Sequence, residues 1–246
     1  MTQRQQQLIG AVALTAAIVA LIVVALVIDP LSDAVVITEP GDEYTGLARR
    51  QTTDGAPLLG APNAPVTVVY FVDFACPHCG NYWGTLQTFI TDAVRTGTAR
   101  LELRILAGLN PTGSPLAAQA ALCAGEQGAL WEMSSALFQM QAEFGRAAFV
   151  NNRISAAAEN LRLNTSDLLT CLNDDSRFAE ALQTNIDLAT SLDVISLPAV
   201  LLRQGDSRFN PPQWLMLDGE PYRGSVPLGV LGEAVRAITA PGNTVP

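Results

Sequence analysis

The sequence contains no lysine and a single histidine, and these shortages limit the functions that it can have. All 14 basic residues are arginines, and 23 acidic residues outnumber them, so that the formal net charge at pH 7 is -9. Nucleic-acid binding domains carry clustered positive charge, and an excess of acidic residues has the wrong sign for that role. We therefore expect no nucleic-acid partner.

Cysteine is also scarce, and its arrangement argues against a zinc site. Two of the four cysteines, Cys76 and Cys79, form a C-x-x-C pair. A structural zinc site needs four ligands, usually from a second closely spaced pair. Cys123 and Cys171 are far apart in the sequence, and His78 is the only histidine, so we expect no metal. An even number of cysteines is typical of an oxidising compartment, although cysteine usage alone does not decide the location.

The most informative motif is Cys76-Pro77-His78-Cys79, which follows the apolar run 66–74 and opens a segment that can form a helix. Unpaired N–H groups and the helix dipole favour negative charge at a helix N-terminus, and such sites lower the pKa of a cysteine from about 8.5 to roughly 3.5–7.5. Cys76 is the expected nucleophile. Cys79 lies one turn further along and is the expected resolving thiol. The motif therefore predicts thiol-disulfide exchange.

The two residues between the cysteines admit either supporting or purely structural roles. Pro77 suits the first turn of a helix, where its missing N–H is not needed, and starting the helix is a sufficient reason for it. A lone histidine is commonly an ordinary surface or core residue. Between two cysteines, however, the imidazole of His78 can help to stabilise a thiolate, which we expect as a secondary role.

Residues 8–28 form an uncharged apolar stretch of 21 residues, long enough to cross a bilayer as a helix. The stretch is longer than the apolar core of an ordinary signal peptide and ends without a small-x-small cleavage site, which favours an uncleaved anchor. Arg4 in the short N-terminal segment 1–7 precedes it, and acidic residues follow it. We expect a single-pass cell-membrane protein with its N-terminus inside and its catalytic domain on the extracytoplasmic side.

Residues 29–64 are rich in Pro, Gly, Asp and Thr and have no sustained period, so we interpret them as an acidic linker. A flexible chain of about 30 residues reaches on the order of 30 Å, which would keep the domain near the membrane. Short ordered pieces such as 35–38 packing on the domain remain an alternative. The rest of the chain suffices for one compact domain, assigned to 65–240, with a tail at 241–246.

The domain pattern alternates strands and helices and indicates an α/β fold. A strand, a helix and a second strand at its start suggest a right-handed crossover unit. The second of these strands alternates polar and apolar residues, which predicts that one of its faces is exposed to solvent. The expected elements are strand 66–72, a helix from Cys76 toward Val94, strand 100–106, a helical block at about 114–190, strands 197–202 and 213–217, and a final helix to about Ile238.

Residues 69–79, which read Val-Tyr-Phe-Val-Asp-Phe-Ala-Cys-Pro-His-Cys, resemble the active-site strand and helix of DsbA-type disulfide oxidoreductases. Residues 114–124, together with Glu126-Gln127-Gly128 and Trp131-Glu132, are similar to the start of that family's inserted helical region, and the resemblance returns around Pro198. It covers about 65–238. It implies a thioredoxin fold with an inserted helical subdomain, here preceded by a single transmembrane helix.

The resemblance also implies roles for residues outside the motif. Pro198 matches the family's cis-proline, whose loop lies beside the two cysteines and contacts substrates; an edge-strand proline is the simpler reading. Here Leu197 precedes it, where many relatives have threonine or valine. Tyr70 stands where many thioredoxin-fold relatives keep a buried acid that assists proton transfer. Asp73 is a candidate to take over part of that role, and a solvated loop carboxylate is the alternative.

Cys123 and Cys171 lie in the expected helical block, where some DsbA-type relatives carry a second disulfide. We expect a structural disulfide, and closing a loop of about 49 residues would stabilise the fold by about 4 kcal/mol in the chain-entropy model. Two buried free thiols and a redox-active second pair are the alternatives.

The resemblance implies a membrane-anchored dithiol oxidase that introduces disulfides into exported proteins through Cys76 and Cys79. Its expected partners are cysteine-containing exported substrates and a membrane quinone-linked thiol oxidase that reoxidises it, and its expected cofactor is none beyond the redox-active disulfide. Two alternatives remain open. One is a reductase or isomerase of the same fold, and the other is a non-enzymatic thioredoxin-like accessory subunit of a membrane complex.

Overall fold

The computed structural model of the chain describes residues 37–38, 42–205 and 210–240. The expected segments 1–7, 8–28 and 241–246 lie outside these residues, so the predicted membrane anchor stays a prediction. Within the described ranges, no helix has both the length and the apolar character required to cross a bilayer.

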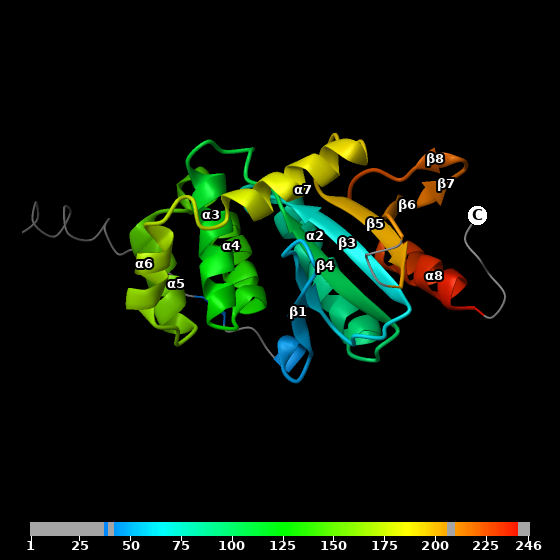
Figure 1. The fold of residues 1–246 in the computed structure, drawn as a ribbon, viewed down its shortest axis with the longest axis horizontal. Coiled ribbons are helices and arrows are strands. Elements are labelled where there is room, and N and C mark those ends of the chain that lie inside the picture. The colour runs from blue at the N-terminus through cyan, green and yellow to red at the C-terminus, as the bar shows by residue number, and fades with distance from the viewer. Residues whose placement is uncertain (1–36, 39–41, 206–209, 241–246) are drawn as a thin grey trace, which may run out of the picture. The chain divides into compact units, whose positions relative to one another are not determined.

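A six-stranded sheet with the order β1-β2-β4-β3-β5-β6 organises the fold (Figure 1). The central strands β3 and β4 are parallel, and every other neighbouring pair is antiparallel. A separate two-stranded sheet pairs β7 with β8. The strands are β1 (Arg49–Gln51), β2 (Pro57–Leu59), β3 (Val66–Val72), β4 (Ala99–Ile105), β5 (Ala199–Gln204), β6 (Gln213–Trp214), β7 (Met216–Leu217) and β8 (Glu220–Pro221).

Helices cover both faces of the sheet and form a separate group beside it. Helices α2 and α8 contact each other, and α8 contacts β3, whereas α7 packs on β4; α3 to α6 pack against one another, and α4 also packs against α2 (Figure 1). The helices are η2 (Asp42–Tyr44), α2 (Pro77–Phe89), the π-helix η3 (Ile90–Val94), α3 (Gly113–Glu126), α4 (Leu130–Phe144), η4 (Gly145–Ala147), α5 (Asn151–Asn160), α6 (Thr165–Leu172), α7 (Ala179–Ser191) and α8 (Leu228–Thr239).

The predicted strand-helix-strand start is confirmed, because β3 is buried throughout and leads through a short loop into α2. The inserted helices α3 to α7 occupy the expected block between β4 and β5. The strand predicted at 213–217 is two strands. Gln213–Trp214 ends the main sheet and Met216–Leu217 pairs with β8, and the buried Leu215 between them turns the chain from one sheet to the other.

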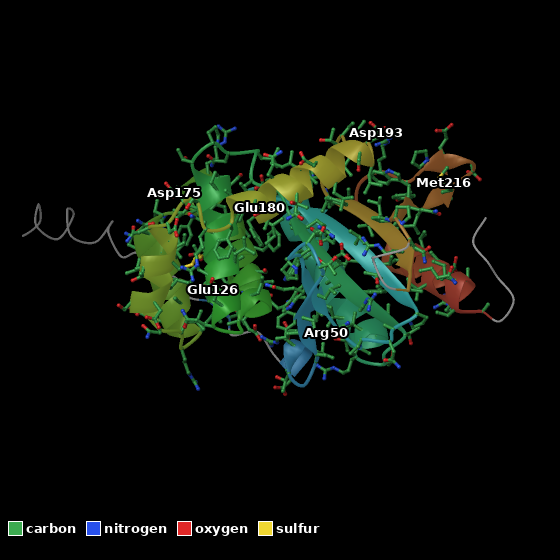
Figure 2. All side chains as sticks on the ribbon, in the orientation of Figure 1. Arg50, Glu126, Asp175, Glu180, Asp193 and Met216 are labelled. Carbon is green, nitrogen blue, oxygen red and sulfur yellow. A yellow bond between two sulfur atoms is a disulfide. The ribbon has the colours of Figure 1, made fainter. Side chains whose placement is uncertain are left out.

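The expected structural disulfide is present within the helical block. Cys123 on α3 is bonded to Cys171 on α6, with 5.9 Å between their Cα atoms and 48 residues of sequence separation (Figure 2). The bond ties the first helix of the insertion to a later one. The alternative of two buried free thiols is therefore wrong.

The segment predicted as a linker, 29–64, packs on the domain at Ile37 and Thr38, as the alternative expected, and belongs to the fold from Asp42 onward. Tyr44 is 1% exposed, and its hydroxyl group shares a hydrogen bond of 2.8 Å with the Ser135 hydroxyl. Arg95 donates to the carbonyl oxygens of Glu43 and Thr45 at 2.8 and 3.2 Å. The β1–β2 hairpin then extends the main sheet. The linker prediction was wrong here because strands of three residues are too short to show a period.

The prediction that one face of strand 100–106 is exposed to solvent was also wrong. All seven residues of β4 are buried, including the polar side chains of Arg100, Glu102 and Arg104. These side chains lie on the face that α7 covers; Arg100 donates to the Thr67 hydroxyl group at 2.8 Å, and Glu102 and Arg104 form an ion pair. Glu102 accepts from Arg104 Nε at 2.7 Å and from Arg203 on β5, and Arg104 Nη1 donates to Asp54 at 2.7 Å. The alternating pattern correctly separated the two faces of the strand. The polar side chains on one face, however, bond to other protein groups instead of to water.

Replacing Glu102 with Ala should lower the free energy of unfolding by about 3–5 kcal/mol, because Arg104 and Arg203 would keep their buried charges without their shared partner. Denaturant unfolding followed by tryptophan fluorescence measures the change. The matched control is Glu126→Ala, which breaks the exposed pair with Arg177 and should cost about 0–1 kcal/mol. Equal losses for the two variants would contradict a stabilising role of the buried cluster.

Candidate active site

Cys76 lies at the junction of the central strand and α2. The strand β3 ends at Val72, and after a short loop Cys76 is the N-cap of α2, with Pro77 in the first turn. The Cys76 sulfur accepts a hydrogen bond from the Cys79 backbone N–H at 3.4 Å, in the way that a serine or aspartate side chain caps a helix. The predicted placement of the thiol at a helix N-terminus is therefore confirmed.

The two thiols of the motif have opposite environments. Both are free, and Cys76 is 4% exposed while Cys79 is completely buried. The thiol of Cys79, the backbone N–H groups of Cys79 and His78, and the positive charge of His78 lower the pKa of Cys76 to about 6, against the effect of burial. The neighbouring Cys76 sulfur and burial raise the pKa of Cys79 far above its ordinary value. At neutral pH the pair is thus a thiolate at Cys76 and a thiol at Cys79.

The exposed His78 lowers the pKa of Cys76 less than the buried Cys79 does. Pro77 and His78 are both exposed to solvent. The effect of His78 on Cys76 runs through its backbone N–H as well as its imidazole. This is consistent with the secondary role expected from the sequence, and Pro77 occupies the helix-start position expected for it.

The predicted cis-proline lies beside the nucleophile. The Leu197–Pro198 peptide bond is cis, and Pro198 directly precedes β5, which pairs with β3. The Leu197 carbonyl oxygen is 3.9 Å from the Cys76 sulfur. The chain thus brings a backbone acceptor from the far side of the helical insertion, 121 residues away in sequence, to the reactive sulfur.

Asp73 is fully buried, so the alternative of a solvated loop carboxylate was wrong. Its Oδ1 accepts from the Ala75 N–H and the Ser114 hydroxyl, both at 2.8 Å. Its Oδ2 accepts from the N–H groups of Gly108 and Leu109, at 3.0 and 2.9 Å. The carboxylate therefore joins the loop before Cys76, the loop after β4 and the start of α3. Proton transfer by Asp73 stays a prediction, and its visible role is to hold these loops together.

Tyr70 is the site residue that the sequence did not identify as functional. The residue is fully buried, and its hydroxyl group donates to the Cys79 carbonyl oxygen at 3.1 Å. Its ring packs against Tyr82 and Trp83, with centroid distances of 5.8 and 6.3 Å. The only signal in the sequence was its position six residues before Cys76, on the face of β3 that points toward α2.

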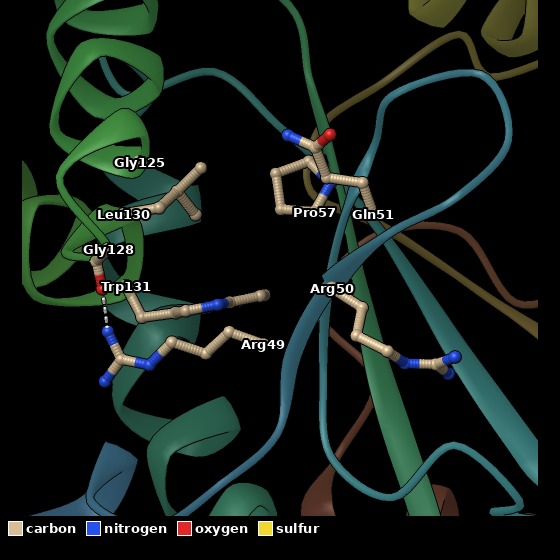
Figure 3. A pocket seen from close by; sticks show the side chains of 8 residues that line it. All are labelled: Arg49, Arg50, Gln51, Pro57, Gly125, Gly128, Leu130 and Trp131. Carbon is tan, nitrogen blue, oxygen red and sulfur yellow. Dashed lines mark hydrogen bonds between the residues drawn. The ribbon is translucent and has the colours of Figure 1, made fainter.

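Other candidate sites lie apart from the cysteine pair. Cys123 and Cys171 are not at the active site. A cavity of about 390 Å³ between the β1–β2 hairpin and the turn from α3 to α4 is lined by none of the motif residues (Figure 3). Its lining includes Arg49, whose guanidinium group is already bound by Glu132. Among the described residues no cluster of three or more His, Cys, Asp or Glu side chains is placed to hold a metal.

Titration of the reduced full-length chain should show a thiolate that forms with a midpoint near pH 6, because the pKa of Cys76 is lowered to about that value. Ultraviolet absorbance of the thiolate as a function of pH measures it. Cys76→Ser should remove the transition. Cys79→Ala should move the midpoint upward toward about 8.5, since it removes the hydrogen bond that lowers the pKa most. An unchanged midpoint in Cys79→Ala would contradict this assignment.

Comparison with known proteins agrees with this site. A family model described as Thioredoxin matches residues 52–213, which contain the motif, the insertion and Pro198. A thioredoxin-like oxidoreductase from Silicibacter pomeroyi has a similar structure, with a TM-score of 0.59 and 24% identity, covering 82% of this chain and 99% of its own. The α-DsbA1 protein from Wolbachia pipientis is similar with a TM-score of 0.59 and 16% identity, covering 74% of this chain and 90% of its own.

The similar curated proteins are of another kind, because they are Na(+)/H(+) antiporters. The Na(+)/H(+) antiporter NhaA 1 of Salinispora arenicola is 39% identical over 86 residues, which are 35% of this chain. The match spans only 13% of the antiporter's length. The family model, by contrast, covers most of the folded domain. The chain belongs to the thioredoxin family, and its resemblance to the DsbA-type thiol-disulfide oxidoreductases is confirmed.

Proposed function

We propose that this thiol-disulfide oxidoreductase is a dithiol oxidase that introduces disulfides into exported proteins. The observation that carries the proposal is the placement of the Cys76 sulfur, which receives the Cys79 N–H at the start of α2 and has its pKa lowered to about 6. A stabilised thiolate favours the reduced enzyme. The oxidised enzyme is then a strong oxidant, because reduction of its disulfide produces the stabilised Cys76 thiolate.

The geometry supports a two-step transfer of the disulfide. A substrate thiolate attacks the Cys76 sulfur, the bond between Cys76 and Cys79 breaks, and the Cys79 sulfur takes the electron pair. The second thiolate of the substrate then attacks its own mixed-disulfide sulfur. The substrate leaves oxidised, and Cys76 keeps the second electron pair as a thiolate. The electrons are carried by the two cysteines alone, so we propose no dissociable cofactor.

The site has groups placed for each part of this reaction. The Leu197 carbonyl oxygen lies 3.9 Å from the Cys76 sulfur and marks where an extended substrate backbone would pass. Asp73 holds the loop before Cys76 against the loop after β4 and the start of α3 through four hydrogen bonds. Cys79 is buried, which directs the incoming thiolate to Cys76.

The location and the reoxidising partner also belong to the proposal. The apolar stretch 8–28 would anchor the chain in the cell membrane with its N-terminus inside. The catalytic domain would face the extracytoplasmic side, where exported proteins acquire disulfides. A membrane quinone-linked thiol oxidase would return Cys76 and Cys79 to the disulfide form.

One observation favours the alternative of an accessory subunit. The sequence similarity to an Na(+)/H(+) antiporter is consistent with a thioredoxin-like domain that works beside a membrane protein. That role would not need a reactive thiol. The reductase or isomerase alternative uses the same cysteines and differs only in the direction of electron flow.

The redox equilibrium of the full-length chain with glutathione distinguishes oxidase from reductase. We expect a potential above about -200 mV, because the Cys76 thiolate stabilises the reduced form, whereas a value near or below about -250 mV would favour a reductase. Reduced and oxidised fractions are measured by alkylation and mass shift.

Cys76→Ser is the matched control for this measurement. It should abolish redox cycling while the Cys123–Cys171 disulfide stays intact. A cellular role that survives Cys76→Ser would sink the enzymatic proposal and support the accessory one.

Protease treatment of intact cells or spheroplasts tests the orientation. The described domain should be cleaved from outside, and a tag on the N-terminus should be protected, because 8–28 would span the membrane. As the control, the same tag should be cleaved once the membrane has been permeabilised. Protection of the domain in intact spheroplasts would contradict the proposed location.

A further inference from the structure

The Cys79 sulfur must carry a negative charge at a place that water does not reach. When a thiolate opens the Cys76–Cys79 disulfide, Cys79 leaves as a thiolate, yet its side chain is 0% exposed. A buried charge without a hydrogen-bond partner is strongly destabilised. The rate of disulfide opening therefore depends on which donors the protein places around this sulfur.

Two hydrogen-bond donors lie beside Cys79. The backbone N–H of Asp73 and the hydroxyl group of Tyr70 both lower the pKa of Cys79, against the larger effects of Cys76 and burial. The Tyr70 hydroxyl donates to the carbonyl oxygen of the same residue, Cys79, at 3.1 Å. Rotation about its C–O bond and a small shift of the side chain would turn this donor from the carbonyl oxygen to the sulfur.

Tyr70 remains available as a hydrogen-bond donor. Burial, the two cysteines and Tyr82 raise the pKa of Tyr70 well above its ordinary value. These are the ionisable groups that face it from α2 and its N-cap. The phenol therefore keeps its proton at every physiological pH, and it can stabilise a thiolate without becoming charged.

We propose that Tyr70 is a catalytic residue whose hydroxyl group donates a hydrogen bond to the Cys79 sulfur as that sulfur leaves as a thiolate. The inference rests on the proposed redox role of Cys76 and Cys79, and it names the group that assists their reaction. With glutathione, the glutathione thiolate forms a bond to the Cys76 sulfur and the Cys76–Cys79 bond breaks. The Cys79 sulfur takes the electron pair, and it acquires the proton that a second glutathione thiol releases as it ionises.

Tyr70→Phe and Tyr82→Phe in the full-length chain form a matched pair. Both tyrosines are buried, their rings are neighbours, and each change removes one hydroxyl group. The Tyr82 hydroxyl is buried without a hydrogen-bond partner in the described part of the chain. The measurement is the second-order rate constant for opening of the oxidised enzyme by reduced glutathione, read by acid quench and alkylation.

Tyr70→Phe should lower this rate constant roughly 10- to 100-fold, the effect of one hydrogen bond to a charged group. Tyr82→Phe should change it less than about twofold. The equilibrium constant with glutathione should move less than about threefold in both variants, because Cys79 is an uncharged thiol in the reduced enzyme. A purely structural role of Tyr70 would not separate rate from equilibrium in this way.

An unchanged rate in Tyr70→Phe, or an equal loss in Tyr82→Phe, would overturn the proposal. If Tyr70→Phe loses the native fold, 3-fluorotyrosine at position 70 keeps the ring and makes the hydroxyl group a stronger donor. The rate must then exceed that of the unaltered chain, and a rate at or below it would also overturn the proposal. Failure of the unaltered chain to react at all would instead contradict the proposed function.

Discussion

The structure depends on one interaction, in which the Cys76 sulfur occupies the position of a helix-capping side chain. The N–H groups at the start of α2 have no partners within the helix, and a sulfur that accepts from Cys79 N–H at 3.4 Å satisfies one of them. The same contact stabilises negative charge on that sulfur. A local requirement of helix geometry thus also makes the thiol reactive, and the remaining parts of the fold keep this helix end in place.

The fold supports that helix end with buried polar groups rather than with apolar packing alone. The carboxylate of Asp73 takes four hydrogen bonds from three segments and so fixes the loop that leads to Cys76. On the opposite face of the sheet, Glu102 links β4 to β5 through Arg203. Buried ion pairs of this kind cost desolvation energy, and this one reaches across β3, which lies between β4 and β5 in the sheet. The strand after the cis-proline is thereby held against the strand before the motif.

The two cysteines lie in different surroundings that shift their thiol pKa values in opposite directions, and this difference is the chemical basis of the site. Cys76 is held at a helix end with its pKa lowered to about 6, and Cys79 is buried with its pKa raised. An enzyme with such a pair has one sulfur suited to attack by substrate and one suited to leave and return. The hydroxyl group of Tyr70, a residue that carries no charge, contacts the second of these cysteines at its carbonyl oxygen. A neutral phenol can assist a buried thiolate without adding a second negative charge to the core.

Much of the site could be predicted from the sequence, because its central contacts are local. The apolar strand 66–72, Pro77 in the first turn and two cysteines one turn apart are encoded within a few residues, and their geometry followed as expected. The resemblance supplied the cis-proline and the Cys123–Cys171 bond, which connect distant segments. Only the tertiary structure decided that Arg100, Glu102 and Arg104 are buried, that Arg49–Gln51 and Pro57–Leu59 join the sheet, and that Tyr70 contacts Cys79. The burial of β4 rests on contacts between residues far apart in the chain, such as Glu102 and Arg203, 101 residues apart, and the Tyr70–Cys79 contact rests on how β3 packs against α2. A local pattern of polar and apolar residues shows which face of a strand a side chain occupies, but it does not show what covers that face.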